Sequence, residues 1–175
     1  MQDKETEELL KAAKRCDPDA FTELMQMHMK DMYRVAIAIL MNDEDAADAI
    51  QDTILTCWEK IGSLRKDSYF KTWLTRILIH KCYDIRKSRM HVTRLEEYEE
   101  PVANDSYNIE WKEMLSVIEE KYRIVLMLFY GEGYHIEEIA QILKIPKSTV
   151  STQLQRGREK LAKYYGISKK EKKHG

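Results

Sequence analysis

Residues 134–161, YHIEEIAQILKIPKSTVSTQLQRGREKL, have the pattern of two helices joined by a tight turn. In the first half, apolar side chains recur at helical spacing, at Ile136, Ile139, Ala140 and Leu143. Pro146 ends this pattern, because the residue before a proline is disfavoured in the helical region. A second apolar stripe follows at once, at Val150, Leu154, Gly157 and Leu161. The segment therefore predicts a helix-turn-helix.

The opposite face of the second predicted helix is polar and basic. It carries Lys147, Ser148, Ser151, Thr152, Gln155 and Arg156, with Lys160 one turn further along. Side chains of these types donate hydrogen bonds to base edges and phosphates in a major groove. A helix hairpin that merely faces water is the simpler alternative. Residues 144–163 hold six basic side chains against one acidic side chain, which favours binding to duplex DNA.

The composition of the whole chain limits the class of protein. Its 175 residues include 29 basic and 30 acidic side chains, and its few prolines and glycines favour helices. The apolar runs are too short to span a bilayer, and the amino terminus lacks a secretion signal, so we expect a cytoplasmic protein. Three cysteines, far apart, predict core thiols and neither a disulfide framework nor a metal site. No cofactor is expected.

Charge divides the chain into segments. Residues 91–110 contain one basic and six acidic side chains, no helical stripe, and Pro101 among turn-forming residues. This composition is typical of a solvated linker. We therefore predict an all-α protein, with a first domain over residues 1–90, a flexible acidic linker, a second domain over residues 111–166 that contains the helix-turn-helix, and a basic tail over residues 167–175.

The first domain contains two long helical patterns before residue 62. Asp17 and Pro18 begin one pattern, whose apolar stripe continues to Leu40. Asn42 begins the next, with an apolar side at Ala47, Ile50, Ile54, Trp58 and Ile61. Its other side carries Asp45, Asp48, Gln51 and Asp52. Solvation, a metal site and a docking surface for a basic partner all fit such a face, and the metal site is the weakest because no glycine interrupts the acidic residues.

Aromatic and basic residues alternate in the next stretch. A break at Gly62 and Ser63 leads to a loop and then to a helix, and the candidate residues are Arg65, Lys66, Tyr69, Phe70, Arg76, His80, Lys81, Arg86 and Lys87. Aromatic faces stack unpaired bases while cations hold the backbone, so the pattern predicts a site for single-stranded DNA. The alternative is that Phe70 and Trp73 are core residues that anchor the helix, and for Trp73 this explanation is at least as good.

In this order the segments resemble the extracytoplasmic-function (ECF) group of bacterial RNA polymerase sigma factors. The resemblance extends from about residue 17 to residue 164. It depends on four segments in register: DPDAFTELM, DEDAADAIQDTILTCWEKI, FKTWLTRILIHKCYDIRKSR and EEKYRIVLMLFYGEGYHIEEIAQILKIPKSTVSTQLQRGREKL.

The resemblance implies a two-domain helical protein with no catalytic centre. It implies that Asp45, Asp48, Gln51 and Asp52 dock on a coiled coil of the largest polymerase subunit. The stretch from residue 65 to residue 89 would open the minus-ten promoter element and hold a flipped base. The helix that begins at Lys147 would read the minus-thirty-five element, and the second domain would also contact the polymerase flap. An anti-sigma factor is the further partner that the resemblance implies.

Several positions depart from the usual family pattern. His80 stands where asparagine is more frequent, and Glu119 follows Ile118 where a leucine-proline pair is common. Ser148, Ser151 and Gln153 replace more frequent glycine and basic residues, and His135 replaces the usual serine or threonine cap. Base readout depends on such side chains, so no promoter consensus is transferred to this chain.

Two other classes of protein were weighed. A stand-alone helix-turn-helix regulator would bind duplex DNA without polymerase, but it needs neither an acidic docking face nor a strand-binding segment. An enzyme is the weaker alternative. His80 and Asp84 are four residues apart on one helix, yet no third metal ligand stands at a suitable spacing, and no phosphate-binding glycine loop is present.

Overall fold

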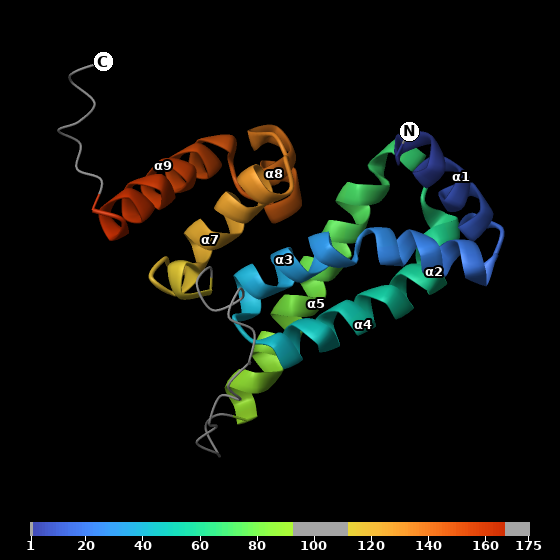
Figure 1. The fold of residues 1–175 in the computed structure, drawn as a ribbon, viewed down its shortest axis with the longest axis horizontal. Helices are drawn as coiled ribbons and strands as arrows, with labels where there is room; N and C mark the ends of the chain where they lie inside the picture. Colours follow the sequence, from blue (N-terminus) through green and yellow to red (C-terminus); the bar gives the residue numbers. More distant parts are fainter. Residues whose placement is uncertain (1, 93–111, 167–175) are drawn as a thin grey trace. The chain divides into compact units, whose positions relative to one another are not determined.

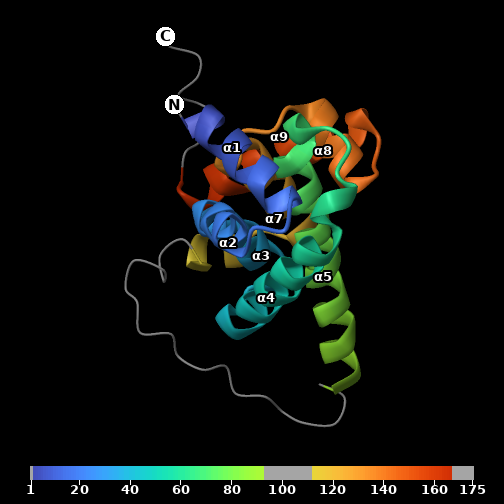
Figure 2. The same ribbon diagram turned by 90° about the vertical axis from the view of Figure 1, so that its right-hand side faces the viewer.

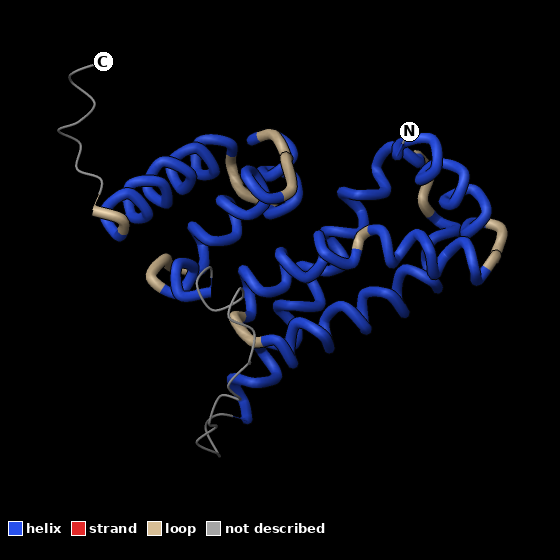
Figure 3. The backbone as a smooth tube through the Cα atoms, viewed as in Figure 1, coloured by secondary structure: helices blue, strands red, loops and turns tan. Residues whose placement is uncertain are grey.

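The computed structural model describes residues 2–92 and 112–166, and all regular structure within these ranges is helical (Figure 3). The chain divides into two compact units, Met1–Glu97 and Tyr98–Gly175. The prediction of an all-α protein with two small helical domains is therefore confirmed. The predicted basic tail and most of the predicted linker lie outside the described residues.

The described part of the first unit, residues 2–92, is a bundle of five α-helices and two short 3-10 helices. In chain order these are α1 (Gln2–Lys14), α2 (Pro18–Met27), α3 (Met29–Leu40), α4 (Asp43–Lys60), η1 (Ile61–Ser63), η2 (Asp67–Tyr69) and α5 (Phe70–Val92). Helices α3, α4 and α5 pack along one another, while α1 packs on α2 and η1 (Figure 1 and Figure 2). Leu24, Ile37, Cys57 and Leu78 are fully buried between these helices.

The structure differs from the sequence prediction at two places in this unit. The helix expected to run from Pro18 to Leu40 is broken at His28, whose backbone (φ −99°, ψ 2°) lies outside the α-helical region and separates α2 from α3. Ala47 and Trp58, expected on the apolar side of α4, are exposed. Trp58 packs edge-on against the ring of the buried residue Phe21, with 5.0 Å between the ring centroids.

The described part of the second unit begins with a short helical segment, residues 112–116. It continues with α7 (Glu120–Leu126), the π-helical turn η3 (Met127–Gly131), α8 (Ile136–Leu143) and α9 (Lys147–Tyr164). Helix α9 packs against both α7 and α8. A Cβ atom on Gly157 would lie 2.9 Å from Cδ1 of Leu126 and 3.3 Å from Cβ of Tyr122, so a larger residue would force α7 side chains to shift where α9 crosses α7. The predicted close approach is thus confirmed.

The cysteines divide into two kinds. Cys57 and Cys82 are buried, and burial raises the pKa of each thiol to about 12, as the prediction of core thiols requires. Cys16 is exposed at a position with φ 65°, so the same prediction is wrong for this residue. None of the described helices has the length and apolar composition needed to cross a membrane.

Candidate nucleic-acid and partner interfaces

The helix-turn-helix forms as the sequence predicts. Helix α8 ends at Leu143, and Lys144 takes the left-handed conformation (φ 55°) that turns the chain. The N–H of Ile145 donates to the carbonyl oxygen of Ala140, and α9 begins directly after Pro146. Val150 and Leu154 are buried on the inner side of α9. This packing leaves the opposite side of α9 to solvent.

The polar face of α9 is exposed where DNA binding was predicted. The exposed residues are Lys147, Ser148, Ser151, Thr152, Gln155 and Arg156, and Lys160 is half-buried. The Thr152 hydroxyl donates to the carbonyl oxygen of Ser148 (2.9 Å), and the Gln155 amide donates to Glu159 (3.3 Å). The structure therefore brings the predicted duplex-binding residues together on one helix face.

Carboxylates hold the lysines at the two ends of this face. The Lys147 ammonium lies 2.9 Å from Glu137 of α8, and the Lys160 ammonium lies 2.7 Å from Glu119, which precedes α7. The hydrogen bond from Lys160 lowers the pKa of the Glu119 carboxyl, and the Glu119 hydrogen bond raises the pKa of Lys160. Lys147 likewise lowers the pKa of Glu137. An anion that approaches either ammonium group competes with these carboxylates.

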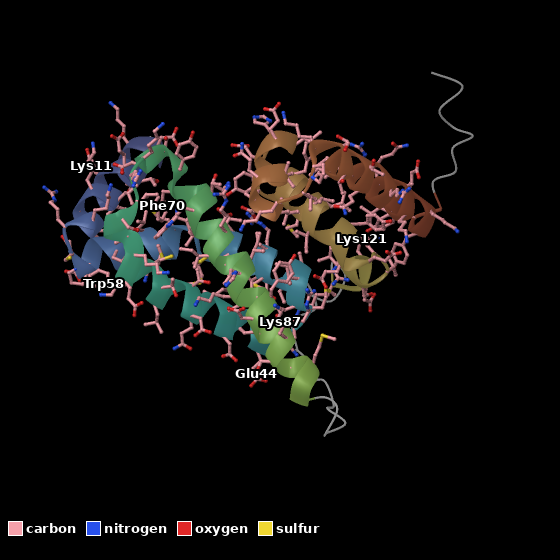
Figure 4. The ribbon with its side chains drawn as sticks, turned by 180° about the vertical axis from the view of Figure 1, so that it is seen from behind. Lys11, Glu44, Trp58, Phe70, Lys87 and Lys121 are labelled. Carbon is pink, nitrogen blue, oxygen red and sulfur yellow. The ribbon has the colours of Figure 1, made fainter. Side chains whose placement is uncertain are left out.

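A shallow cavity of about 230 Å³ lies beside the polar face of α9. Its lining combines the start of α7 with α9, and consists of Lys121, Tyr122, Ser148, Thr149, Thr152, Gln153 and Arg156. Lys121 and Tyr122 were not predicted as part of the surface. Lys121 lies at the start of α7 (Figure 4), 25 residues before Pro146 ends the turn, and only the packing of α7 on α9 places it there.

The loop between α4 and α5 presents basic and aromatic side chains to solvent. Arg65 and Lys66 are exposed, and Tyr69 is 55% exposed. The Lys66 ammonium lies 5.7 Å from the centre of the Tyr69 ring, within the range of a cation–π contact. This arrangement offers an aromatic face beside two cations, as the single-strand prediction requires.

Helix α5 extends this surface. Arg76, His80 and Lys87 are exposed and lie four and seven residues apart, so they project from one side of the helix. Lys87 is labelled in Figure 4. Lys81 and Arg86 are half-buried beside this stripe, and the Arg86 guanidinium covers the Tyr83 ring at 4.7 Å. His80 lies 3.7 Å from Asp84, and no group of three metal-ligating side chains occurs among the described residues.

Phe70 does not belong to the exposed surface. Phe70, labelled in Figure 4, is 3% exposed at the first turn of α5. Its ring packs edge-on against the His28 ring (5.4 Å between centroids) and beside the Trp73 ring (6.1 Å). Burial lowers the pKa of His28, which favours the neutral ring in this apolar contact. Of the two explanations left open for Phe70, the structure agrees with the core residue.

The acidic face of α4 is exposed except at its first member. Asp48, Gln51 and Asp52 face solvent, with Leu55 (59% exposed) and Trp58 (40% exposed) further along the helix. Asp45 is 6% exposed, and its carboxylate lies 2.5 Å from the Arg89 guanidinium of α5. Burial raises the pKa of Asp45, and Arg89 opposes this shift. The expectation that Asp45 projects outward with the others is therefore wrong.

The two units carry different surfaces. One unit has a helix-turn-helix with an exposed polar face, and the other has an aromatic and basic surface together with an acidic helix face. This is the organisation expected of a two-domain helical transcription factor of the sigma type.

Comparison with known proteins identifies the family. The family model described as Sigma-70 region 2 matches residues 24–91, and the model described as Sigma-70, region 4 matches residues 109–161. The ECF RNA polymerase sigma factor SigM of Mycobacterium tuberculosis is 31% identical over 164 residues, which cover 91% of this chain and 84% of the relative. SigW of Bacillus subtilis, also an ECF sigma factor, is 30% identical over 176 residues, covering 88% and 93%.

Solved structures show the same fold. The sigma factor RpoE from Bartonella quintana, in complex with the anti-sigma factor NepR, matches with a TM-score of 0.74 at 22% identity, covering 85% of this chain and 98% of that chain. CnrH, in complex with the cytosolic domain of CnrY, matches with a TM-score of 0.67 at 22% identity, covering 91% and 96%.

The chain belongs to the ECF RNA polymerase sigma factors. The prediction of an alternative sigma factor is confirmed, and a stand-alone regulator is not favoured.

Proposed function

We propose that this chain binds core RNA polymerase, recognises two promoter elements and promotes melting of promoter DNA. The observation that carries the proposal is that two units, which match Sigma-70 regions 2 and 4 in order, each expose a polar and basic surface. We assign residues 1–90 to polymerase docking and the minus-ten element, and residues 111–166 to the minus-thirty-five element.

The minus-thirty-five surface is the exposed face of α9. Ser151, Thr152 and Gln155 present donors and acceptors near its middle, while Lys147, Arg156 and Lys160 supply positive charge. Short polar side chains suit contacts to base edges, and cations suit phosphates. Lys121 adds a cation from α7 at the edge of the same surface.

The minus-ten surface combines the loop after α4 with the exposed stripe of α5. Tyr69 is the exposed ring available for stacking an unpaired base, with Arg65 and Lys66 beside it for the backbone. Arg76, His80 and Lys87 continue the path along α5. Phe70 contributes by holding the first turn of α5 in the core.

The polymerase-docking surface is the exposed face of α4. Asp48, Gln51 and Asp52 offer negative and polar groups to a basic partner, and Leu55 and Trp58 add apolar area at the same face. Asp45 does not face solvent with these residues, and its pair with Arg89 joins α4 to α5.

Two further properties follow from this proposal. The chain acts through binding energy without a catalytic residue of its own, in the cytoplasm, where the polymerase acts. An anti-sigma factor is a proposed partner. The support is the structural likeness to RpoE, which was solved with the anti-sigma factor NepR, and to CnrH, which was solved with the cytosolic domain of CnrY.

In vitro transcription tests the proposal. Purified core polymerase is given a library of promoter fragments with and without the protein, and transcripts are mapped. Start sites that require the protein are expected, and their upstream sequences should share two elements. The absence of such transcripts, together with tight binding to duplex DNA by the protein alone, would contradict the proposal.

A further inference from the structure

Helix α1 reaches the loop that carries the minus-ten residues, although α1 precedes the segment matched by Sigma-70 region 2, residues 24–91. The ammonium group of Lys14, the last residue of α1, donates to the carbonyl oxygen of Leu64 (2.8 Å) and to Oδ1 of Asp67 (2.9 Å). These acceptors lie 50 and 53 residues further along the chain. One side chain thus joins the amino-terminal helix to the loop.

The two bonds enclose the exposed part of the loop. Leu64 is buried (8% exposed) before it and Asp67 begins η2 after it, so Arg65 and Lys66 lie between the two points that Lys14 holds. The N–H of Tyr69 donates to the carbonyl oxygen of Lys66 (3.1 Å), which links the aromatic residue to the same segment. Lys14 is therefore bonded to both ends of the segment that carries Arg65 and Lys66 and that leads into Tyr69.

Lys14 is itself fixed by packing. Leu10 and Ala13, one turn and one residue before it, are each 1% exposed, because α1 packs on α2 and η1. The side chains of Lys14 and Asp67 are 24% and 30% exposed. Such a sheltered, charge-assisted bond is stronger than an ion pair in open solvent.

We propose that Lys14 is a positioning residue for promoter recognition. It holds the loop so that Arg65, Lys66 and Tyr69 are presented to the melted minus-ten strand in one arrangement, and it thereby sharpens discrimination between bases. Since a preordered loop loses less conformational entropy on binding, the correct base is captured at lower cost. This inference rests on the proposed function.

The test uses the full chain with core polymerase. A promoter obtained with the wild-type protein is substituted at each minus-ten base in turn, and the ratio of transcription from the original to each substituted promoter is measured. Lys14→Met removes both hydrogen bonds, and we expect this ratio to fall about fivefold at the captured base, the order of magnitude of a typical net hydrogen-bond contribution. Lys11→Met is the matched control, because Lys11 (labelled in Figure 4) is exposed on the same helix and pairs with Glu7.

Two further variants separate positioning from folding. Lys14→Arg keeps both hydrogen bonds and should restore the wild-type ratio. Asp67→Ala removes one of the two acceptors, so it should lower the ratio by a smaller factor, and the double variant should be no worse than Lys14→Met alone. If Lys14→Met fails to fold, Asp67→Ala decides the question.

Unchanged discrimination in Lys14→Met, or in Asp67→Ala where that variant decides, would overturn the inference while leaving the proposed function intact. An equal loss in Lys11→Met would also overturn it, because the effect would then be one of charge alone. If the wild-type protein supports no transcription at all, the proposed function fails and this inference fails with it.

Discussion

Two ion pairs of the first unit and two of the second differ in how far their carboxylates are exposed. In the first unit, Lys14 with Asp67 and Arg89 with Asp45 join separate elements, and the carboxylates are 30% and 8% exposed. In the second unit, the carboxylates that hold the lysines of α9 are far more exposed, at 70% for Glu137 and 55% for Glu119. The first kind of pair joins two helices or a helix and a loop, whereas the second kind covers the face of α9 that we propose to bind DNA.

This difference has a consequence for DNA binding. Exposed ion pairs contribute little to stability and are screened by salt, so a phosphate can replace Glu119 or Glu137 at small cost. In the first unit, within the ranges that the structure describes, Arg65, Arg76 and Lys87 form no ion pair. We therefore expect DNA binding by the second unit to depend on phosphates that displace carboxylates from lysines. DNA binding by the first unit should depend on the conformation of the loop between α4 and α5.

The largest effect should come from Tyr69→Ala in the first unit. Stacking of one base is worth about 1 to 3 kcal/mol, so formation of the open complex should fall by roughly tenfold or more. The measurement is permanganate reactivity of the minus-ten region in the complete complex with polymerase. Tyr69→Phe keeps the ring and is the control.

Binding of the same complexes to duplex DNA containing only the minus-thirty-five element should be unchanged by Tyr69→Ala. A parallel loss in that assay would show that the residue supports folding or docking and does not capture a base.

Charge removal on α9 should have the next largest effect. Arg156→Ala should weaken binding to duplex promoter DNA by roughly tenfold at low salt and reduce the slope of log affinity against log salt by about 0.9. Lys160→Ala should weaken binding less, because Lys160 must first leave Glu119. Titrations of the holoenzyme on a minus-thirty-five duplex across a series of salt concentrations measure both quantities. An unchanged slope in both variants would remove these residues from the phosphate contacts.

Much of the fold, and the exposed faces of α9 and α5, could be predicted from sequence. Helical periodicity placed Val150 and Leu154 inside α9 and its polar residues outside, because a helix with one apolar stripe has only one way to bury it. The same reasoning identified the exposed cations of α5. The all-helical class and the division into two domains followed from the same patterns and from the charge of the segments.

The remaining features depend on contacts that periodicity does not describe. Asp45 is the first residue of the acidic face. Its carboxylate is buried where it pairs with Arg89 of another helix, α5. Phe70 lies at a loop-to-helix junction, where spacing does not assign a face, and His28 completes its pocket. Lys14 and Asp67 are 53 residues apart in sequence, so nothing local predicts their bond.

Removing a covering carboxylate should strengthen DNA binding by the second unit. Glu119→Gln frees Lys160 for a phosphate, and we expect affinity for the minus-thirty-five duplex to rise about twofold to threefold at low salt, with the gain lost at high salt. Glu113→Gln is the control, since it removes an equal charge from an exposed residue of the same unit. An equal gain in both variants would mean that net charge, and not the pair with Lys160, limits binding.

The smallest effect concerns stability of the first unit. In Asp45→Asn, the free energy of unfolding near neutral pH should change by less than about 1 kcal/mol, because the Arg89 side chain, 37% exposed, can be hydrated once its partner is gone. The direction of the change should depend on pH. The folded protein raises the pKa of Asp45, so ionising this residue destabilises the fold as the pH rises through that pKa, and asparagine lacks this penalty.

We therefore expect Asp45→Asn to gain stability relative to the wild type as the pH is raised from below the ordinary aspartate pKa, about 3.9, to above the raised value. Urea denaturation of both proteins at several pH values measures this difference. If instead the variant loses stability as the pH rises, the attraction of Arg89 outweighs the burial of Asp45. The pair would then stabilise the unit by its charge, as well as fixing the geometry of α4 against α5.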